Sequence, residues 1–203
     1  MLHARLFESL DALAGTGSGD VHHVLCVLCN LTWHARSDIE GRYCETYLAG
    51  TIRALAHYQG DGVIGGLAAN TLANLLRCKS LRGSPIAPEA VLCILDAYHH
   101  QPDSLTAQAL CEAVGYFSED PDTFESLPHT DVIVATLDCI HAHGDNSDVV
   151  MVAVTALRNM AQLGSEHQDT LRRHNTLGTL EGIEFGDEEV AAAIHALRNF
   201  LTE

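Results

Sequence analysis

Apolar residues recur along most of this chain at intervals of three and four positions, which is the period of an amphipathic α-helix. The segments with this pattern come in pairs separated by turn residues. The paired ranges are about 2–13 with 21–33, 43–58 with 63–77, 89–99 with 104–117, 131–141 with 149–163, and 177–183 with 188–201. The alternation of apolar and polar residues that is typical of strands is missing from the sequence. The pattern therefore predicts an all-α protein built from helix pairs.

The second helix of each pair carries a polar residue at the same position, two residues after a leucine. These residues are Asn30, Asn74, Glu112, Asn159 and Asn199, at intervals of 44, 38, 47 and 40. Because asparagine is a mediocre helix former, its recurrence at one register indicates a shared architectural or binding role. Repeats of this length are typical of a stacked helical-repeat solenoid.

One face of these second helices is polar or mixed in every copy. Four residues before the polar position stand Cys26, Asn70, Gln108, Thr155 and His195. Three residues after it stand Trp33, Arg77, Gly115, Gln162 and Thr202. We expect stacking to join these positions into a continuous polar surface.

Shorter segments lie between the pairs. The ranges 36–42, 119–127 and 166–174 are expected to form a short additional helix, whereas 79–88, which contains two prolines, is expected to be a turn. The glycines within 62–66 are expected to allow close contact between helices.

The order of elements in each unit resembles the armadillo repeat: a short helix, an apolar helix, and a third helix that reads small-x-x-x-Leu-x-Asn-Leu. Related HEAT repeats lack the recurrent amide on the third helix. The resemblance implies a right-handed armadillo-like superhelix, a single domain over residues 1–203. Its repeats would span approximately 1–35, 36–78, 79–118, 119–163 and 164–203.

The resemblance also implies a function, because the third helices of armadillo proteins line a concave groove whose asparagines bind the backbone of an extended peptide. We therefore expect a non-catalytic interaction or scaffold module within an intracellular complex. The residues expected to bind the partner are Asn30, Asn70, Asn74, Arg77, Gln108, Glu112, Asn159, His195 and Asn199. Import receptors of this family have tryptophan where Cys26, Asn70, Gln108, Thr155 and His195 stand, so their mode of reading basic signals is not expected. An alternative keeps the amides purely structural, bonded to neighbouring backbone or to the next repeat.

The net charge of the chain indicates which classes of partner it can bind. Eleven Lys and Arg against 27 Asp and Glu give a net charge of −16. This charge opposes binding to nucleic acid and to anionic membranes, and it favours a basic protein or peptide. No uninterrupted apolar stretch approaches the ~20 residues that a membrane span needs.

Seven cysteines, most of them inside apolar helical segments, are typical of reduced core residues in an intracellular protein. We expect a cytoplasmic or nuclear location, and armadillo modules of this size also occur in cytoskeletal and ciliary assemblies. Cys26 and Cys29 have CxxC spacing and lie near His22, but no second ligand pair follows. We predict buried thiols there, with no metal and no cofactor. His99, His100 and His141 are expected near helix C-termini, where a cation is favoured.

No catalytic motif is present in the sequence: it has no P-loop, no dinucleotide fingerprint and no nucleophile elbow. We therefore predict no catalytic residue and no enzyme. Two alternatives remain, an enzyme or metalloprotein built on an α-solenoid and an armadillo-type chaperone co-factor. The last predicted helix ends close to Glu203, so we also expect this C-terminal end to dock on another subunit or on a second copy of the chain.

Overall fold

The computed structural model describes residues 18–34, 44–58, 60–181, 183 and 188–202. Every regular element within these ranges is a helix, so the predicted all-α fold is confirmed. The chain divides into two compact units, Met1–Ala113 and Val114–Glu203, and each is described by itself. The expectation of one continuous repeat domain stays a prediction. The helices expected at 2–13 and 36–42 lie outside the described residues.

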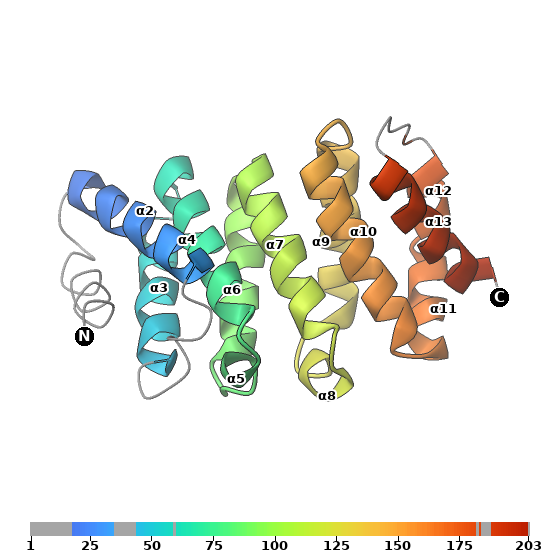
Figure 1. Ribbon diagram of the computed structural model, residues 1–203, viewed down its shortest axis with the longest axis horizontal. Coiled ribbons are helices and arrows are strands. Elements are labelled where there is room, and N and C mark those ends of the chain that lie inside the picture. Colours follow the sequence, from blue (N-terminus) through green and yellow to red (C-terminus); the bar gives the residue numbers. More distant parts are fainter. Residues whose placement is uncertain (1–17, 35–43, 59, 182, 184–187, 203) are drawn as a thin grey trace. The chain divides into compact units, whose positions relative to one another are not determined.

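The first unit consists of two layers of helices (Figure 1). Its elements are α2 (Ser18–His34), α3 (Cys44–Tyr58), α4 (Gly62–Leu76), α5 (Lys79–Arg82), α6 (Ala87–His100) and residues 104–113 of α7 (Ser104–Phe117). The helices that carry the polar positions, α2 and α4, are the third helices of successive repeats and pack on one another. The helices that come first in each pair, α3 and α6, also pack on one another. Within the repeat, α3 packs on α4. This is the layering that stacked repeats require.

Helix α4 lies at the centre of this unit and carries no charged residue. It begins where the Asp61 carboxylate accepts a hydrogen bond from the backbone N–H of Ile64 (3.2 Å), an N-cap. Its glycines lie at close approaches. A Cβ on Gly66 would stand 2.9 Å from Leu105 Cδ2, and one on Gly62 would collide with the Gln101 side chain. The expectation of close helix contact is therefore confirmed for Gly66, which faces Leu105 of α7, whereas Gly62 faces Gln101 in the turn after α6.

The segment 79–88 differs from its prediction. Instead of a simple turn, it contains the one-turn helix α5, in which Leu81 N–H and Arg82 N–H donate to the carbonyl of Cys78. Leu81 is fully buried, so the tertiary core rather than local propensity selects this turn of helix. Pro88 lies in the first turn of α6, where its missing N–H needs no intrahelical partner.

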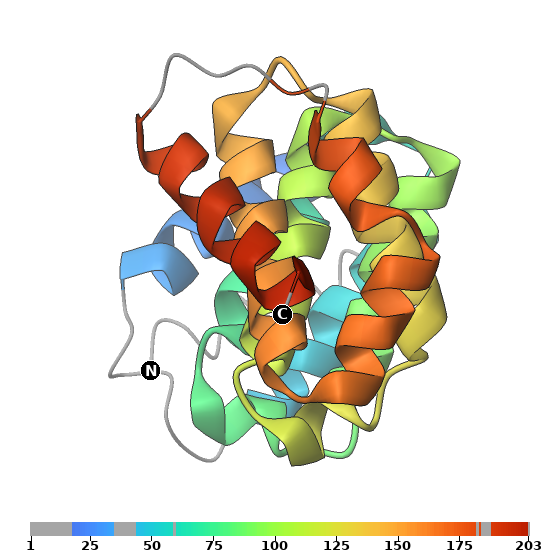
Figure 2. The same ribbon diagram turned by 90° about the vertical axis from the view of Figure 1, so that its right-hand side faces the viewer.

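The second unit repeats the arrangement. Its elements are the end of α7, α8 (Pro121–Phe124), α9 (His129–Ala142), α10 (Ser147–Gln162), α11 (Ser165–Arg173), α12 (Thr176–Glu181) and α13 (Glu188–Thr202). The third helices α10 and α13 pack on one another, as Figure 2 shows, and α9 packs on α10 and on α12. Helices α8 and α11 are the short helices predicted within 119–127 and 166–174.

The leucine that precedes each polar position lies in the core. Leu28, Leu72, Leu110, Leu157 and Leu197 all have 0% exposure. The five registers read from the sequence are therefore correct. His99, His100 and His141 lie in the last turns of their helices, as predicted. Among the described residues, no helix is both long enough and apolar enough to cross a bilayer.

Candidate functional site

In the first unit, the polar positions lie on the successive third helices α2, α4 and α7, but their environments differ. Asn30 is exposed, and its Nδ2 donates to the carbonyl of Cys26 in its own helix (2.8 Å). Asn74, on the middle helix, is only 5% exposed. Its Nδ2 donates to the carbonyl of Cys29 on α2 (3.3 Å) and to Asn70 Oδ1 (3.2 Å). The hydrogen bond from Asn74 to the backbone of α2 is the kind expected if the amides only stabilise the stack of repeats.

The Cys29 thiol belongs to the same group of side chains. Burial raises its pKa, an effect that a hydrogen bond with Thr71 partly opposes. The thiol therefore stays protonated at neutral pH and can donate to Asn70 Oδ1 (3.3 Å). A protonated, half-buried thiol that is bonded in this way is a poor nucleophile and a poor metal ligand.

Arg77, the residue after α4, lies beside residues of both neighbouring helices. Its Cζ atom lies 4.6 Å from the ring centroid of Trp33, which is 45% exposed. On the other side, the Arg77 charge acts on Glu112 of α7. Trp33 of α2, Arg77 at the end of α4 and Glu112 of α7 thus place an aromatic ring, a guanidinium group and a carboxylate next to one another.

Glu112 is half-buried, and burial raises the pKa of its carboxyl group above the usual value. Two neighbours oppose this rise: Gln108 Nε2 donates to Glu112 Oε1 (3.0 Å), and the Arg77 charge favours the ionised form. Because burial outweighs both, the carboxylate is less stable than an exposed one. A further positive charge beside it would stabilise its ionised form.

Two buried polar atoms of this group have no hydrogen-bond partner among the described residues. They are Asn74 Oδ1, an acceptor, and Arg77 Nη1, a donor. Buried polar atoms in proteins are almost always bonded. We call the group Trp33, Asn70, Asn74, Arg77, Gln108 and Glu112 the α2–α4–α7 surface.

Apolar side chains extend this surface toward the other ends of the same helices. A hollow there is lined by residues that include His22, Cys26, Val63, Leu67 and Leu105. Val63 is 60% exposed and Leu105 is 37% exposed, and both line this one hollow. The third helices of the first unit therefore offer both polar groups and uncovered apolar area.

In the second unit, the expected site residues are Asn159, His195 and Asn199. Asn159 Nδ2 donates to the carbonyl of Gly115 at the end of α7 (3.2 Å). Gly115 is buried, and a Cβ on it would stand 3.7 Å from the Cβ of Ala156 on α10. Asn199 and His195 are both exposed and lie 3.2 Å apart through Nδ2 and Nδ1. A row of five polar positions across both units stays a prediction.

The other metal-capable residues of α2 have separate contacts. His22 Nε2 lies 3.7 Å from Cys26 Sγ, and the Cys29 thiol lies 3.3 Å from Asn70 Oδ1 on α4. Cys111 and Cys139 are buried as predicted, whereas Cys26, Cys29 and Cys93 are half-buried. Trp33 is not among the site residues expected from the sequence, although it stands at a register position, three residues after Asn30.

Comparison with known proteins adds evidence on the fold. No protein-family model matches this sequence, and neither does any curated protein sequence. Among solved structures, an engineered protein from the Northeast Structural Genomics Consortium superimposes with a TM-score of 0.74 at 21% identity, over 97% of this chain and 81% of that one. A designed armadillo repeat protein superimposes with a TM-score of 0.57 at 14% identity, over 98% of this chain and 99% of that one.

The fold is armadillo-like. The resemblance that the repeat register indicated is thereby confirmed at the level of the fold. At these low identities each of the two solved structures is similar to this chain in fold alone. Folds of this type host many functions. The function must therefore be argued from the α2–α4–α7 surface itself.

Proposed function

We propose that this protein is a non-catalytic interaction module that binds an extended polypeptide across the α2–α4–α7 surface, as a scaffold component of an intracellular complex. The observation that carries the proposal is the exposed Trp33 ring, which is held against Arg77 beside the half-buried Glu112. Stacked helical repeats commonly use such faces for binding.

Tryptophan and arginine are the residues that most often dominate binding energy at protein interfaces. A tryptophan that served only the core would be buried, yet 45% of Trp33 is exposed. The Arg77 guanidinium group over its ring restricts both side chains before a partner arrives. Less conformational entropy is then lost on binding.

The polar atoms of the surface suit a polypeptide backbone. Asn74 Oδ1 lacks a donor and Arg77 Nη1 lacks an acceptor among the described residues. Each peptide unit offers one N–H donor and one C=O acceptor. Arg77 is half-buried, so a carbonyl of a bound strand beside it would satisfy Nη1.

Charge supports a basic partner. The chain has a net charge of −16, and burial raises the pKa of the Glu112 carboxyl group. A lysine or arginine of the partner beside Glu112 would favour the ionised carboxylate. Affinity should therefore fall with rising salt, and it should fall with decreasing pH as Glu112 becomes protonated.

The proposal can be tested with a peptide library. Three helices ~10 Å apart span ~20 Å, which about six extended residues cover. Random peptides of about twelve residues, displayed on phage, would be selected on the full chain and counter-selected on the double variant Trp33→Ala, Arg77→Ala. We expect enriched peptides to combine basic and apolar residues and to bind the double variant at least about 30-fold more weakly, since two anchors are lost.

Leu92→Ala provides the matched control, because Leu92 is a 40% exposed apolar residue on α6, outside the surface. It should leave peptide affinity unchanged. Circular dichroism would verify that all variants keep their helices. Selected peptides that bind the double variant as tightly as the parent protein would refute the proposal, and so would an absence of enrichment.

A further inference from the structure

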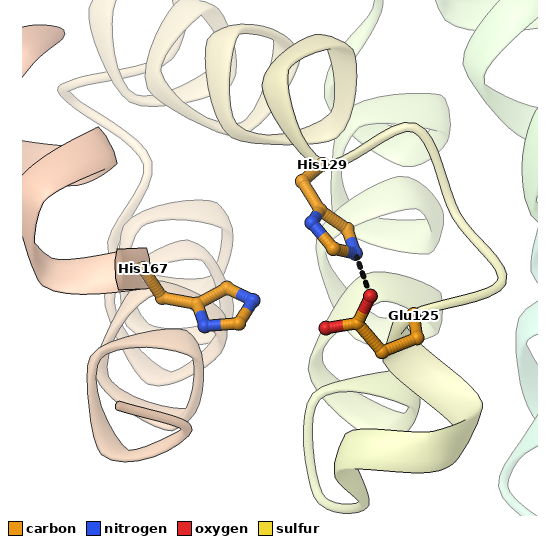
Figure 3. A group of neighbouring side chains, drawn as sticks. All are labelled: Glu125, His129 and His167. Carbon is orange, nitrogen blue, oxygen red and sulfur yellow. Dashed lines mark ion pairs between the residues drawn. The ribbon is translucent and has the colours of Figure 1, made fainter. Parts of the chain in front are cut away.

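Three side chains with metal-ligating atoms converge in the second unit. Glu125 follows α8, His129 begins α9, and His167 lies in the first turn of α11. One ligand atom from each residue lies within 4.8 Å of the others. Figure 3 shows the two imidazole rings and the carboxylate turned toward a common space. We call these residues the Glu125–His129–His167 cluster.

His129 is held in place from two sides. Its ring stacks on Phe124, with centroids 4.7 Å apart and planes 5° apart. Its Nε2 lies 3.2 Å from the Phe124 carbonyl oxygen and 3.9 Å from Glu125 Oε2. In the tautomer whose Nε2–H donates to that carbonyl, Nδ1 keeps a free lone pair. Metal-binding histidines are commonly oriented by such a bond from the other ring nitrogen.

His167 has an unsatisfied group in the same place. Its Nε2 is buried and has no hydrogen-bond partner among the described residues. Its ring centroid lies 5.2 Å from that of His129 and 5.4 Å from that of Phe124. A buried ring nitrogen without a partner lowers stability. A metal ion bound between the two rings would satisfy it.

Two imidazoles and one carboxylate form a ligand set that suits zinc, with a fourth position left for water. Bonds of ~2.0–2.2 Å in a tetrahedral arrangement place ligand atoms about 3.4 Å apart. The cluster must therefore contract by at most ~1.4 Å. Glu125 can close its own distances to the two histidines because its side chain is 64% exposed, and rotation of the two imidazole rings must supply the rest.

We propose that the Glu125–His129–His167 cluster binds one Zn²⁺ ion, with water as the fourth ligand. The ion would join the segment between α8 and α9 to α11, elements from two successive repeats. Binding would therefore stabilise the second unit against unfolding. The site is separate from the α2–α4–α7 surface in its residues and in its test, so either proposal can fail alone.

The experiment uses tag-free full-length protein stripped of metal by a chelator. Calorimetric titration with Zn²⁺ should give a stoichiometry of about one per chain. Co²⁺ added instead should give the visible absorption of a four-coordinate site with nitrogen and oxygen ligands. Zn²⁺ should also raise the thermal unfolding midpoint. His167→Ala, His129→Ala and Glu125→Gln should each weaken Zn²⁺ binding at least tenfold, because loss of a direct ligand matters at least as much as loss of an outer partner.

Two controls address other metal-capable residues of a chain with 13 histidines and seven cysteines. His174→Ala alters a histidine at the end of α11, and the double variant His22→Ala, Cys26→Ala removes the histidine–cysteine pair of α2. Both should bind Zn²⁺ like the parent protein. Glu125→Gln keeps the test decisive if a histidine variant unfolds, because Glu125 is exposed. The proposal is overturned if the parent protein binds no Zn²⁺, or if the folded cluster variants bind it unchanged.

Discussion

The variants Leu72→Ala and Asn74→Ala compare how much the buried leucine and the polar residue of one repeat each contribute to the stability of the fold. Both residues lie on α4, and both are buried. Leu72→Ala deletes a fully buried side chain and should lower the free energy of unfolding by about 2–5 kcal/mol. Asn74→Ala should change the free energy of unfolding much less, because the substitution has both destabilising and stabilising effects.

Asn74→Ala removes two hydrogen bonds to oxygen, to the Cys29 carbonyl and to Asn70 Oδ1, each worth about 0.5–1.5 kcal/mol, and a weaker contact with Cys29 Sγ (3.7 Å). It also removes the unpartnered Oδ1, whose burial is unfavourable by about 1–3 kcal/mol. Alanine further favours the helix by about 0.5 kcal/mol. The net change in unfolding free energy should lie within about 1 kcal/mol of zero.

Urea unfolding followed by tryptophan emission is the appropriate assay, because Trp33 is the chain's single tryptophan and lies in the first unit. With a slope of ~2 kcal/mol per M, Leu72→Ala should lower the midpoint by about 1–2.5 M. Asn74→Ala should shift it by less than ~0.5 M. Equal losses for the two variants would refute the reasoning, because the amide would then be as important to the stack as the leucine.

Two further predictions concern single residues. Because the folded-state pKa of Glu112 is raised, its charge destabilises the fold above that pKa, so Glu112→Gln should unfold at higher urea than the parent at pH 7. This gain should vanish below the ordinary glutamate pKa of 4.5, and a less stable variant at pH 7 would contradict the assignment. Gly164 has a φ of +143°, so Gly164→Ala should lower the free energy of unfolding by about 1–3 kcal/mol, as measured by thermal unfolding. Gly60→Ala is its control, because nothing lies within 4 Å of the added Cβ there either. Equal losses of stability for the two variants would contradict the assignment of the Gly164→Ala effect to backbone strain.

The helices and their registers could be read from the sequence because burial follows the 3.6-residue period directly. The leucine before each polar position is fully buried in all five copies. The register could not predict how exposed each amide is. Asn30 is exposed and Asn74 is 5% exposed, because burial depends on how neighbouring helices cover each position.

The two candidate sites differ in how far they could be predicted from the sequence. Arg77 and Glu112 occupy register positions and could therefore be predicted as site residues from the sequence, and Trp33 occupies such a position too. The Glu125–His129–His167 cluster depends on a contact across 38 residues, between His129 and His167. No spacing rule reveals such a contact, and the sequence analysis predicted no metal.

The most direct test of the proposed function is the indole N–H resonance of Trp33 in two-dimensional NMR of the labelled full chain. Only one such resonance exists, because the chain has one tryptophan. Titration with a peptide selected on the parent protein should shift this resonance in proportion to the bound fraction measured by calorimetry. A peptide that binds by calorimetry while the Trp33 indole resonance stays fixed would contradict the proposal that the α2–α4–α7 surface is the binding site.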